Sequence, residues 1–201
     1  DLAGISTTAV LQGDHYVVNG QKTFITNGIH ADLVVVACKT DTKVIPKHKG
    51  ISLLVIEKGM TGFEKGKKLD KVGLHAQDTA ELIFDECIVP RENLLGEEGK
   101  GFQYMMEKLQ QERLIVAIAA QVAAEDMLSQ TIDYIKSRTA FGKPISAFQN
   151  TQFKIAEMAT EINIARTYVD ELIVNHMEEK DVVTQESMAK WWITDMTKRV
   201  A

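Results

Sequence analysis

The sequence predicts an α+β protein in which an antiparallel β-barrel or sandwich is followed by an incomplete antiparallel four-helix bundle. Residues 1 to about 90 contain short runs rich in Val, Ile and Leu, separated by turn residues and without a helical pattern between them. Residues from about 102 onward instead repeat apolar side chains at helical spacing. We therefore expect a middle β domain at residues 1–92 and a truncated helical domain at residues 93–201.

The composition is that of an ordinary globular chain. Of the 201 residues, 45% are hydrophobic and 25% are charged, and the net charge is -5. This charge does not favour nucleic acid or an anionic membrane as a partner. No apolar run approaches the roughly 20 residues of a membrane span. Cys38 and Cys87 have no Cys or His neighbour at zinc-ligand spacing, so we expect no metal site and a reducing, intracellular compartment.

The first part of the chain is expected to form at least six strands. They are residues 7–11, 16–19, 21–26, 33–38, 51–56 and 81–89. Gln12–His15 is expected to close a hairpin. Asn19-Gly20 and Asn27-Gly28 are predicted as further turns, because Asn and Gly accept positive φ. A parallel sheet is not expected, since crossover helices are missing.

Two connections in this part stand out. Residues 41–49 carry four basic side chains, Lys43, Lys47, His48 and Lys49. General loop behaviour favours a solvated loop here, and the alternative is a rim that faces a phosphate group. Residues 69–78 show no periodicity and are expected to link a strand to the final strand pair.

The second part is expected to begin with a long helix. Gly96–Gly101 precedes it, and its glycine spacing does not match a dinucleotide-binding loop, so we interpret it as a flexible turn. Residues 102–137 contain no Gly or Pro, and at 1.5 Å per residue this helix would be on the order of 50 Å long. Residues 114–124 are apolar around most of the helix, which predicts burial on nearly all sides.

Two more helices should follow. Residues 139–146 contain Gly142 and Pro144 and are expected to end the first helix. Ser146–Gln149 matches a capping box for the second helix, which shows one apolar face and should end near residues 178–181. Thr184 is expected to cap a third helix. Three antiparallel helices suggest a bundle that lacks at least one member.

Gln110–Arg113 lies at the start of the apolar helical run and places an acid beside a base. A charged pair at the mouth of a buried helix suits catalysis, and it equally suits a structural ion pair. The structural alternative pairs Glu112 with Lys108 one turn earlier, an orientation that contributes only a few tenths of a kcal/mol. Spacing alone favours the structural alternative.

At this point the residues resemble a known family, the acyl-CoA dehydrogenases. The resemblance spans the whole chain, and the order of its motifs is highly specific. It is similar most of all to the long-chain and isovaleryl branch. The segments that carry it are Asp1–Ile5, Val18–Gly28, Ser137–Pro144, Phe148-Gln149, Gln111–Leu114 and Ala189–Trp191.

The resemblance implies a fold of an N-terminal helical domain, a β domain and a C-terminal four-helix bundle, in a homotetramer. It implies non-covalent FAD, an acyl-CoA substrate and an electron-transfer flavoprotein as electron acceptor. In such a reaction the α-hydrogen leaves as a proton and the β-hydrogen as a hydride to flavin N5. The chain would cover roughly the middle half of such an enzyme and be inactive alone. The protein would be soluble, cytoplasmic in a bacterium and in the mitochondrial matrix of a eukaryote.

The family's flavin contacts fall on seven positions. Three match the strand beside the isoalloxazine ring, two the pyrophosphate contact from a neighbouring subunit, and two the next contact with the same cofactor. In that order they are Phe24, Ile25 and Thr26, then Arg138 and Thr139, then Phe148 and Gln149. Without the resemblance, the first three would be a plain strand, Arg138 would offset a helix dipole, and Gln149 would belong to the capping box.

The same resemblance assigns the catalytic base to Glu112, because the long-chain and isovaleryl branch carries a Glu directly before an Arg on this helix. Arg113 matches the residue that approaches CoA, and Gln110 sits where relatives place a second substrate contact. In most of the family the base instead lies in a later motif beyond residue 201. An acyl-CoA oxidase-like flavoenzyme and a non-catalytic member of the fold are the alternatives to a dehydrogenase.

Overall fold

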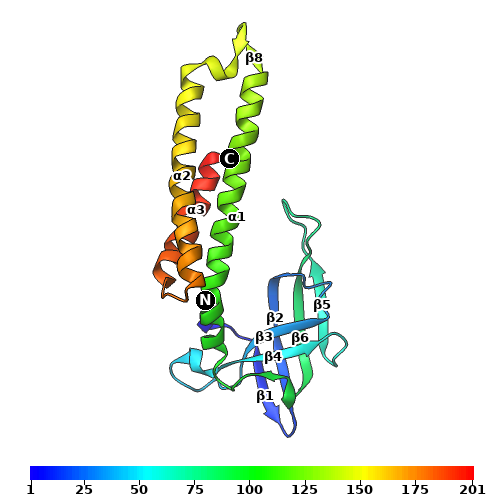
Figure 1. Ribbon diagram of the computed structural model, residues 1–201. Helices are drawn as coiled ribbons and strands as arrows, with labels where there is room; N and C mark the ends of the chain where they lie inside the picture. The colour runs from blue at the N-terminus through cyan, green and yellow to red at the C-terminus, as the bar shows by residue number, and fades with distance from the viewer. The chain divides into compact units, whose positions relative to one another are not determined.

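The computed structural model describes residues 1–201 and divides into two compact units (Figure 1). The β unit is Asp1–Met106 and the helical unit is Glu107–Ala201. The boundary that we expect between the two functional domains, after residue 92, stays a prediction. No helix is long and apolar enough to cross a membrane.

The β unit is built on one seven-stranded sheet. Its strands are β1 (Thr8–Gln12), β2 (His15–Thr26), β3 (Leu33–Lys39), β4 (Ile51–Glu57), β5 (Phe63–Lys68), β6 (Thr79–Pro90) and β7 (Leu94–Leu95). Short 3₁₀ helices η1 (Leu2–Gly4), η2 (Lys47–Gly50) and η3 (Arg91–Asn93) lie between them. The strand order is β5-β6-β2-β1-β3-β4-β7, and all pairs are antiparallel except β1 with β3. The α+β prediction is confirmed, and the sheet is sandwich-like and not closed into a barrel.

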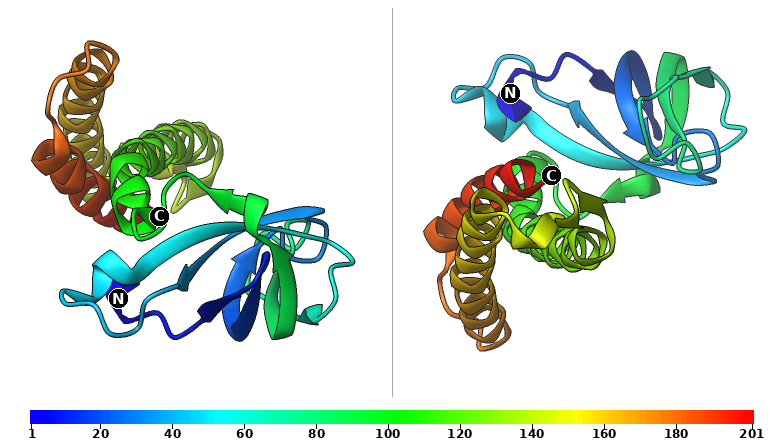
Figure 2. Two further views of the ribbon diagram at one scale, coloured as in Figure 1. Left: turned by 90° about the horizontal axis from the view of Figure 1, so that it is seen from below. Right: turned by 90° about the horizontal axis from the view of Figure 1, so that it is seen from above.

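The sheet of the β unit is curved (Figure 2), and its buried side chains form one hydrophobic core. Its members come from alternate positions of the strands, which is why they share one face. They are Ala9, Tyr16, Val18, Val36, Cys38, Leu54, Ile56, Leu82, Phe84, Cys87 and Val89. Burial raises the pKa of the Cys38 thiol to about 12 and that of Cys87 to about 11. Both cysteines therefore remain neutral thiols that pack as small apolar groups.

Strand β2 differs from the prediction at Asn19-Gly20. These residues form no turn, and β2 runs through them with a bulge opposite β6. Gly20 has φ +140, and a Cβ there would lie 2.8 Å from the Thr7 Cα. The glycine is therefore required by a close approach of two backbone segments, which a turn motif in the sequence cannot reveal. The hairpin at Gln12–His15 is confirmed.

Strand β5 was not expected from the sequence. It carries three lysines and Gly66, and it lies at the edge of the sheet, where lysine protects against pairing with other chains. Only Phe63 gives an apolar signal, and its ring stacks on Phe84 with centroids 5.2 Å apart. Residues 69–78 connect β5 to β6, as predicted.

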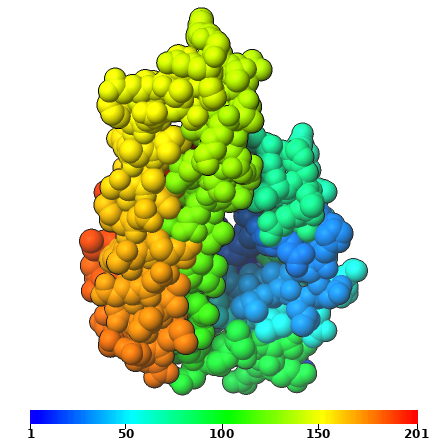
Figure 3. Space-filling view, turned by 45° about the horizontal axis from the view of Figure 1, so that its top comes forward, coloured from blue at the N-terminus to red at the C-terminus, as the bar shows by residue number.

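The helical unit contains three helices, α1 (Gly101–Ser137), α2 (Gln149–Met177) and α3 (Val183–Val200), of which α1 begins six residues earlier, in the β unit. A small hairpin of β8 (Thr139–Ala140) and β9 (Lys143–Pro144), then η4 (Ile145–Ala147), joins α1 to α2. Figure 3 shows this connection projecting beyond the ends of the two helices. The predicted helices are confirmed, but Ile115, Val116 and Val122 are exposed, so burial of α1 on nearly all sides is wrong. In this unit α2 and α3 cover only one side of α1.

The apolar face predicted for α2 is confirmed at Ile162, Ala165, Val169 and Leu172, which are buried. On α3, Met196 is buried whereas Trp191 is 70% exposed. The predicted cap at Thr184 is wrong, because α3 begins at Val183 and no side chain caps it.

Candidate active site

Helix α1 presents Gln110, Glu112 and Arg113 over one turn. Glu112 is exposed, whereas Gln110 and Arg113 are partly buried and Leu114 is buried. No ion pair joins Glu112 to Lys108, so the structural alternative for this carboxylate is not realised. Its oxygens remain free to act on a ligand.

Arg113 is held by a side chain from a distant part of the sequence. Its Nη1 donates to Ser187 Oγ on α3 at 3.3 Å, and the Ser187 hydroxyl donates to the Val183 carbonyl at 2.7 Å. The guanidinium carries five donors, so this one contact leaves most of them available. Nothing in the local sequence around Arg113 pointed to Ser187.

The connection between α1 and α2 presents Arg138 and Thr139. The Arg138 amide donates to the Tyr134 carbonyl, which extends the hydrogen-bond pattern of α1 by one residue. The Arg138 carbonyl accepts from the Ile145 amide. Thr139 pairs with Pro144 in the β8–β9 hairpin. Both side chains are exposed, so an anion can approach them.

The hairpin tip is aromatic and basic. Phe141 and Gly142 both have positive φ, as a two-residue hairpin turn requires, and Phe141 is 96% exposed. The ring of Phe148 lies 6.3 Å from that of Phe141, edge to face, and the Lys143 Nζ sits 4.4 Å above the Phe148 ring. The tip therefore combines a flat apolar surface with positive charge.

The capping box predicted at Ser146–Gln149 is wrong. Ser146 lies inside η4, and the residue that precedes α2 is Phe148, which makes no side-chain cap. The Ser146 carbonyl instead accepts from the Gln152 side chain at 3.0 Å. Gln149 is the first residue of α2 and is exposed, so its amide is not committed to capping.

Glu112 and Arg138 are far apart within one chain. They are separated by 26 positions along α1, and at 1.5 Å per residue this corresponds to about 39 Å. The structure thus brings Gln110, Glu112 and Arg113 together, and Arg138, Thr139, Phe148 and Gln149 together, as two separate groups.

In the β unit, Phe24, Ile25 and Thr26 form the end of β2. A bulge between Lys22 and Ile25 turns Phe24 outward, where it has φ 57 and is 77% exposed. Thr26 is exposed too, whereas Ile25 packs against the core. A left-handed residue other than Gly costs on the order of 1–3 kcal/mol, and such strain gathers where function demands it.

A cavity of about 560 Å³ lies beside the first turns of α1. Its walls are His48, Lys49, Glu98, Gly99, Lys100, Phe102, Gln103 and Met106. The rings of His48 and Phe102 are 4.9 Å apart. Two lysines against one glutamate leave the cavity basic, and His48 and Lys49 come from the 41–49 connection.

Two family models match the chain. The model described as "Acyl-CoA dehydrogenase, middle domain" matches residues 1–87, and "Acyl-CoA dehydrogenase, C-terminal domain" matches residues 99–201. Together they cover nearly all of the sequence.

Curated relatives and solved structures agree. The chain is 44% identical over 201 residues to the mitochondrial long-chain specific acyl-CoA dehydrogenase of Sus scrofa, covering 100% of this chain and 47% of that protein. It is 43% identical over 169 residues to the isovaleryl-CoA dehydrogenase of Pongo abelii, covering 84% and 40%. The crystal structure of an acyl-CoA dehydrogenase from Geobacillus kaustophilus matches with TM-score 0.98 and 69% identity, over 100% of this chain and 53% of that one.

These matches define a class of oxidoreductases that act on acyl-CoA. The chain belongs to the acyl-CoA dehydrogenase family, and it spans about half the length of the relatives it matches.

Proposed function

We propose that this chain forms the middle β domain (residues 1–92) and the truncated helical domain (residues 93–201) of an FAD-dependent acyl-CoA dehydrogenase. The observation that carries the proposal is the free carboxylate of Glu112, on α1 directly before Arg113. The relatives that share this part of the chain include a long-chain specific enzyme and an isovaleryl-CoA dehydrogenase. We propose that the 201 residues act within a longer polypeptide and are inactive alone.

The reaction removes two hydrogens from an acyl-CoA thioester to give the trans-2-enoyl-CoA. Glu112 accepts the α-hydrogen as a proton, and the electron pair of that C–H bond becomes the new C=C bond. When bound, FAD supplies the acceptor that takes the β-hydrogen as a hydride. Arg113 contacts the CoA side of the substrate and Gln110 makes a second contact, so both fix the α-carbon within reach of Glu112.

The chain's own residues fit the cofactor in two places. The exposed Arg138 guanidinium and Thr139 hydroxyl suit a pyrophosphate, and the uncommitted amide of Gln149 and the ring of Phe148 lie on the same connection. The exposed Phe24 ring and Thr26 hydroxyl suit a flat heteroaromatic ring with acceptor atoms, with Ile25 anchored beneath them.

Because Glu112 and Arg138 are about 39 Å apart along α1, one flavin cannot use both from the same chain. We therefore propose that Arg138, Thr139, Phe148 and Gln149 serve the flavin of a second copy in a homotetramer.

The basic cavity at the start of α1 supports the substrate assignment. A CoA thioester carries a phosphorylated nucleotide, and Lys49 and Lys100 supply positive charge to bind it. His48 and Phe102 add aromatic surface on which a base can stack. We propose an electron-transfer flavoprotein as the electron acceptor. We also propose that the protein lies in the cytoplasm of a bacterium or in the mitochondrial matrix of a eukaryote; the relatives from Sus scrofa and Pongo abelii are mitochondrial by name.

The test is an anaerobic titration of the full-length, FAD-loaded enzyme with acyl-CoAs of different length and branching, followed by flavin absorbance. We expect the wild type and the control Asp133→Asn to bleach. Glu112→Gln should keep FAD and lose bleaching. Unchanged bleaching in Glu112→Gln would move the base to another segment, and rapid reoxidation of the reduced enzyme in air would identify an oxidase instead.

A further inference from the structure

The segment Asn27–Ala31, which we name the 27–31 turn, follows directly on Phe24–Thr26. Two residues that are distant in the sequence, Asp78 and Lys65, hydrogen-bond to its backbone. The Asn27 amide donates to the Asp78 carbonyl at 3.0 Å, and the Ile29 amide donates to Asp78 Oδ2 at 2.7 Å. Lys65 Nζ donates to the Ile29 and Ala31 carbonyls at 2.7 and 2.6 Å.

The two tying residues are unusual for their types. Asp78 stands just before β6 and is 3% exposed, although carboxylates are almost never fully buried. Its other oxygen, Oδ1, lies 4.0 Å from His30 Nε2. Lys65 lies on the edge strand β5, where lysines normally point to solvent. Its ammonium group instead donates hydrogen bonds to two backbone carbonyls. Both charges are therefore directed at the main chain of one short turn.

The backbone on either side of Ile25 and Thr26 is left-handed, and at Phe24 this conformation is strained. Phe24 has φ 57 and Asn27 has φ 62, so non-glycine residues in the left-handed region bracket the pair. Gly28 is tightly surrounded, since a Cβ there would lie 3.0 Å from the Ile25 carbonyl oxygen, closer than ordinary van der Waals contact. Conformations of this kind persist only where the surroundings over-determine them. The two hydrogen bonds that Asp78 accepts and the two that Lys65 donates supply that constraint.

We propose that Asp78 and Lys65 are positioning residues that hold Ile25 and Thr26 in the conformation that receives the flavin ring. This rests on the function proposed above and extends it to two residues that do not touch the cofactor. A fixed turn fixes the direction of the Thr26 hydroxyl. A donor that is already oriented stabilises developing charge without reorganising, and this preorganisation requires a supporting layer of contacts.

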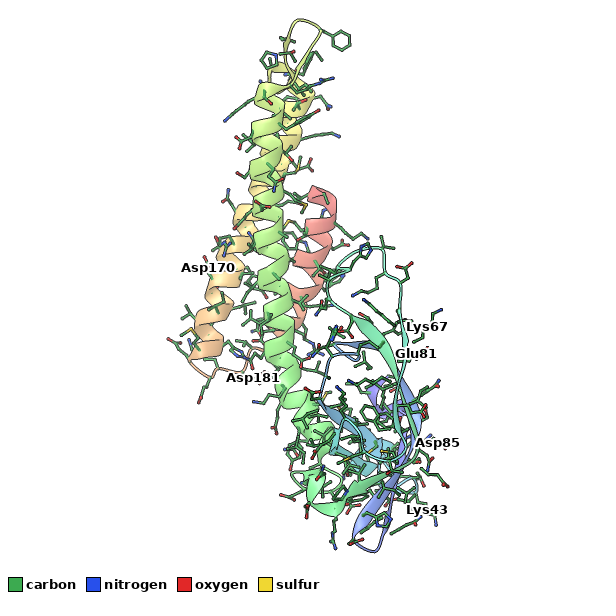
Figure 4. The ribbon with its side chains drawn as sticks, turned by 90° about the vertical axis from the view of Figure 1, so that its right-hand side faces the viewer. Lys43, Lys67, Glu81, Asp85, Asp170 and Asp181 are labelled. Atoms are coloured by element: carbon green, nitrogen blue, oxygen red, sulfur yellow. The ribbon has the colours of Figure 1, made fainter.

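The first experiment measures amide hydrogen exchange in the 201-residue chain. Asp78→Ala and Lys65→Met are compared with Asp85→Ala and Lys67→Met, whose side chains are exposed on β6 and β5 (Figure 4). Asp78→Ala removes the carboxylate that accepts from the Ile29 amide, so exchange at Ile29 should speed up by about tenfold or more. The Asn27 amide keeps its bond to the Asp78 backbone carbonyl, and exchange at both amides should also rise in Lys65→Met because the turn loses the two bonds to its carbonyls. The two control variants should leave the exchange rates of these amides unchanged. None of the four variants should change the exchange rates of the amides that pair between β3 and β4.

The second experiment uses the full-length, FAD-loaded enzyme and measures the flavin reduction potential and the kcat and KM. A merely structural role would leave the potential unchanged in folded variants. We expect Asp78→Ala and Lys65→Met to retain FAD, to shift the potential to more negative values, and to lower kcat more than they change KM. Asp78→Asn should recover part of the loss, because an amide oxygen can still accept from Ile29.

The outcomes separate this proposal from the function on which it rests. A wild type that takes up no FAD overturns both. A wild type that binds FAD and is reduced by acyl-CoA, together with variants of unchanged potential, overturns the positioning role alone. If Asp78→Ala fails to fold, Lys65→Met and Asp78→Asn decide the result by the same measurements.

Discussion

Arg166 on α2 donates through Nε to Oε1 of Glu125 on α1 at 2.7 Å, and a second guanidinium nitrogen contacts Oε2. The Gln121 side chain donates to the same Oε1 at 2.8 Å and also to the Ile162 carbonyl. Two long helices are thus joined near the middle of α1 by a two-pronged ion pair and a buried amide.

This ion pair makes stability depend on pH. The hydrogen bond from Arg166 holds the pKa of Glu125 below its ordinary value, against the opposing effect of burial. A carboxyl with a lowered pKa in the folded state stabilises fully above its unfolded pKa of about 4.3 and loses that contribution as pH falls through the lowered value. Because both side chains are about a third exposed, solvent screening limits the contribution to about 1 kcal/mol.

We expect Glu125→Gln to lower the free energy of unfolding by about 1 kcal/mol near neutral pH. The difference from wild type should vanish in acid, where both proteins lack the charge. Urea unfolding followed by circular dichroism at several pH values measures this. Glu157→Gln, at an exposed site on α2, is the matched control. A deficit that stays constant down to acid would mean that the ionised carboxylate is not what Arg166 binds.

Sharing of flavin sites between copies predicts complementation. A chain with Glu112→Gln keeps Arg138, and a chain with Arg138→Ala keeps Glu112. When both are co-expressed as full-length enzymes, mixed assemblies should contain sites with both groups intact and regain activity that neither variant shows alone. Purified variants mixed without subunit exchange serve as the control. No recovery in verified mixed assemblies would place both groups at the same chain's flavin.

Helix α3 offers a matched pair of large apolar residues. Met196 is fully buried and Trp191 is 70% exposed. In this chain Met196→Ala should cost about 2–5 kcal/mol, because it removes transfer free energy and leaves a cavity. The free energy of unfolding of Trp191→Ala should stay within about 0.5 kcal/mol of the wild-type value. Urea unfolding of the helical unit compares them, and a larger loss for Trp191→Ala would show that its ring is covered in solution.

The sequence was sufficient for elements with a strong period or an obvious turn. Val169 and Leu172 mark the buried face of α2 through spacing alone, and Gln12–His15 marks its hairpin. It was insufficient where the cause is tertiary. Gly20 is needed because Thr7 lies against it. Strand β5 carries three lysines at the edge of the sheet, so it lacks the apolar alternation that predicts a strand.

The candidate site divides in the same way. Glu112 and Arg113 are neighbours in the sequence, so their place on the same turn of one helix was predictable. Their supports are not: Ser187 is 74 positions from Arg113, and Asp78 is 49 positions from Ile29. A single sequence carries no signal for such contacts, because each depends on how the strands and helices pack. The roles of the cofactor and substrate residues therefore stay predictions, to be decided by the experiments above.

The uninterrupted course of α1 has a consequence for how this family can vary. No Gly or Pro lies between Glu112 and Arg138, so the helix is uninterrupted and the number of residues sets the distance between its two ends. Each inserted or deleted residue would shift one end by about 1.5 Å and rotate it by roughly 100° relative to the other. A point substitution along this stretch leaves the spacing of its two ends unchanged, whereas a change in its length would displace and rotate the Arg138 end relative to the Glu112 end.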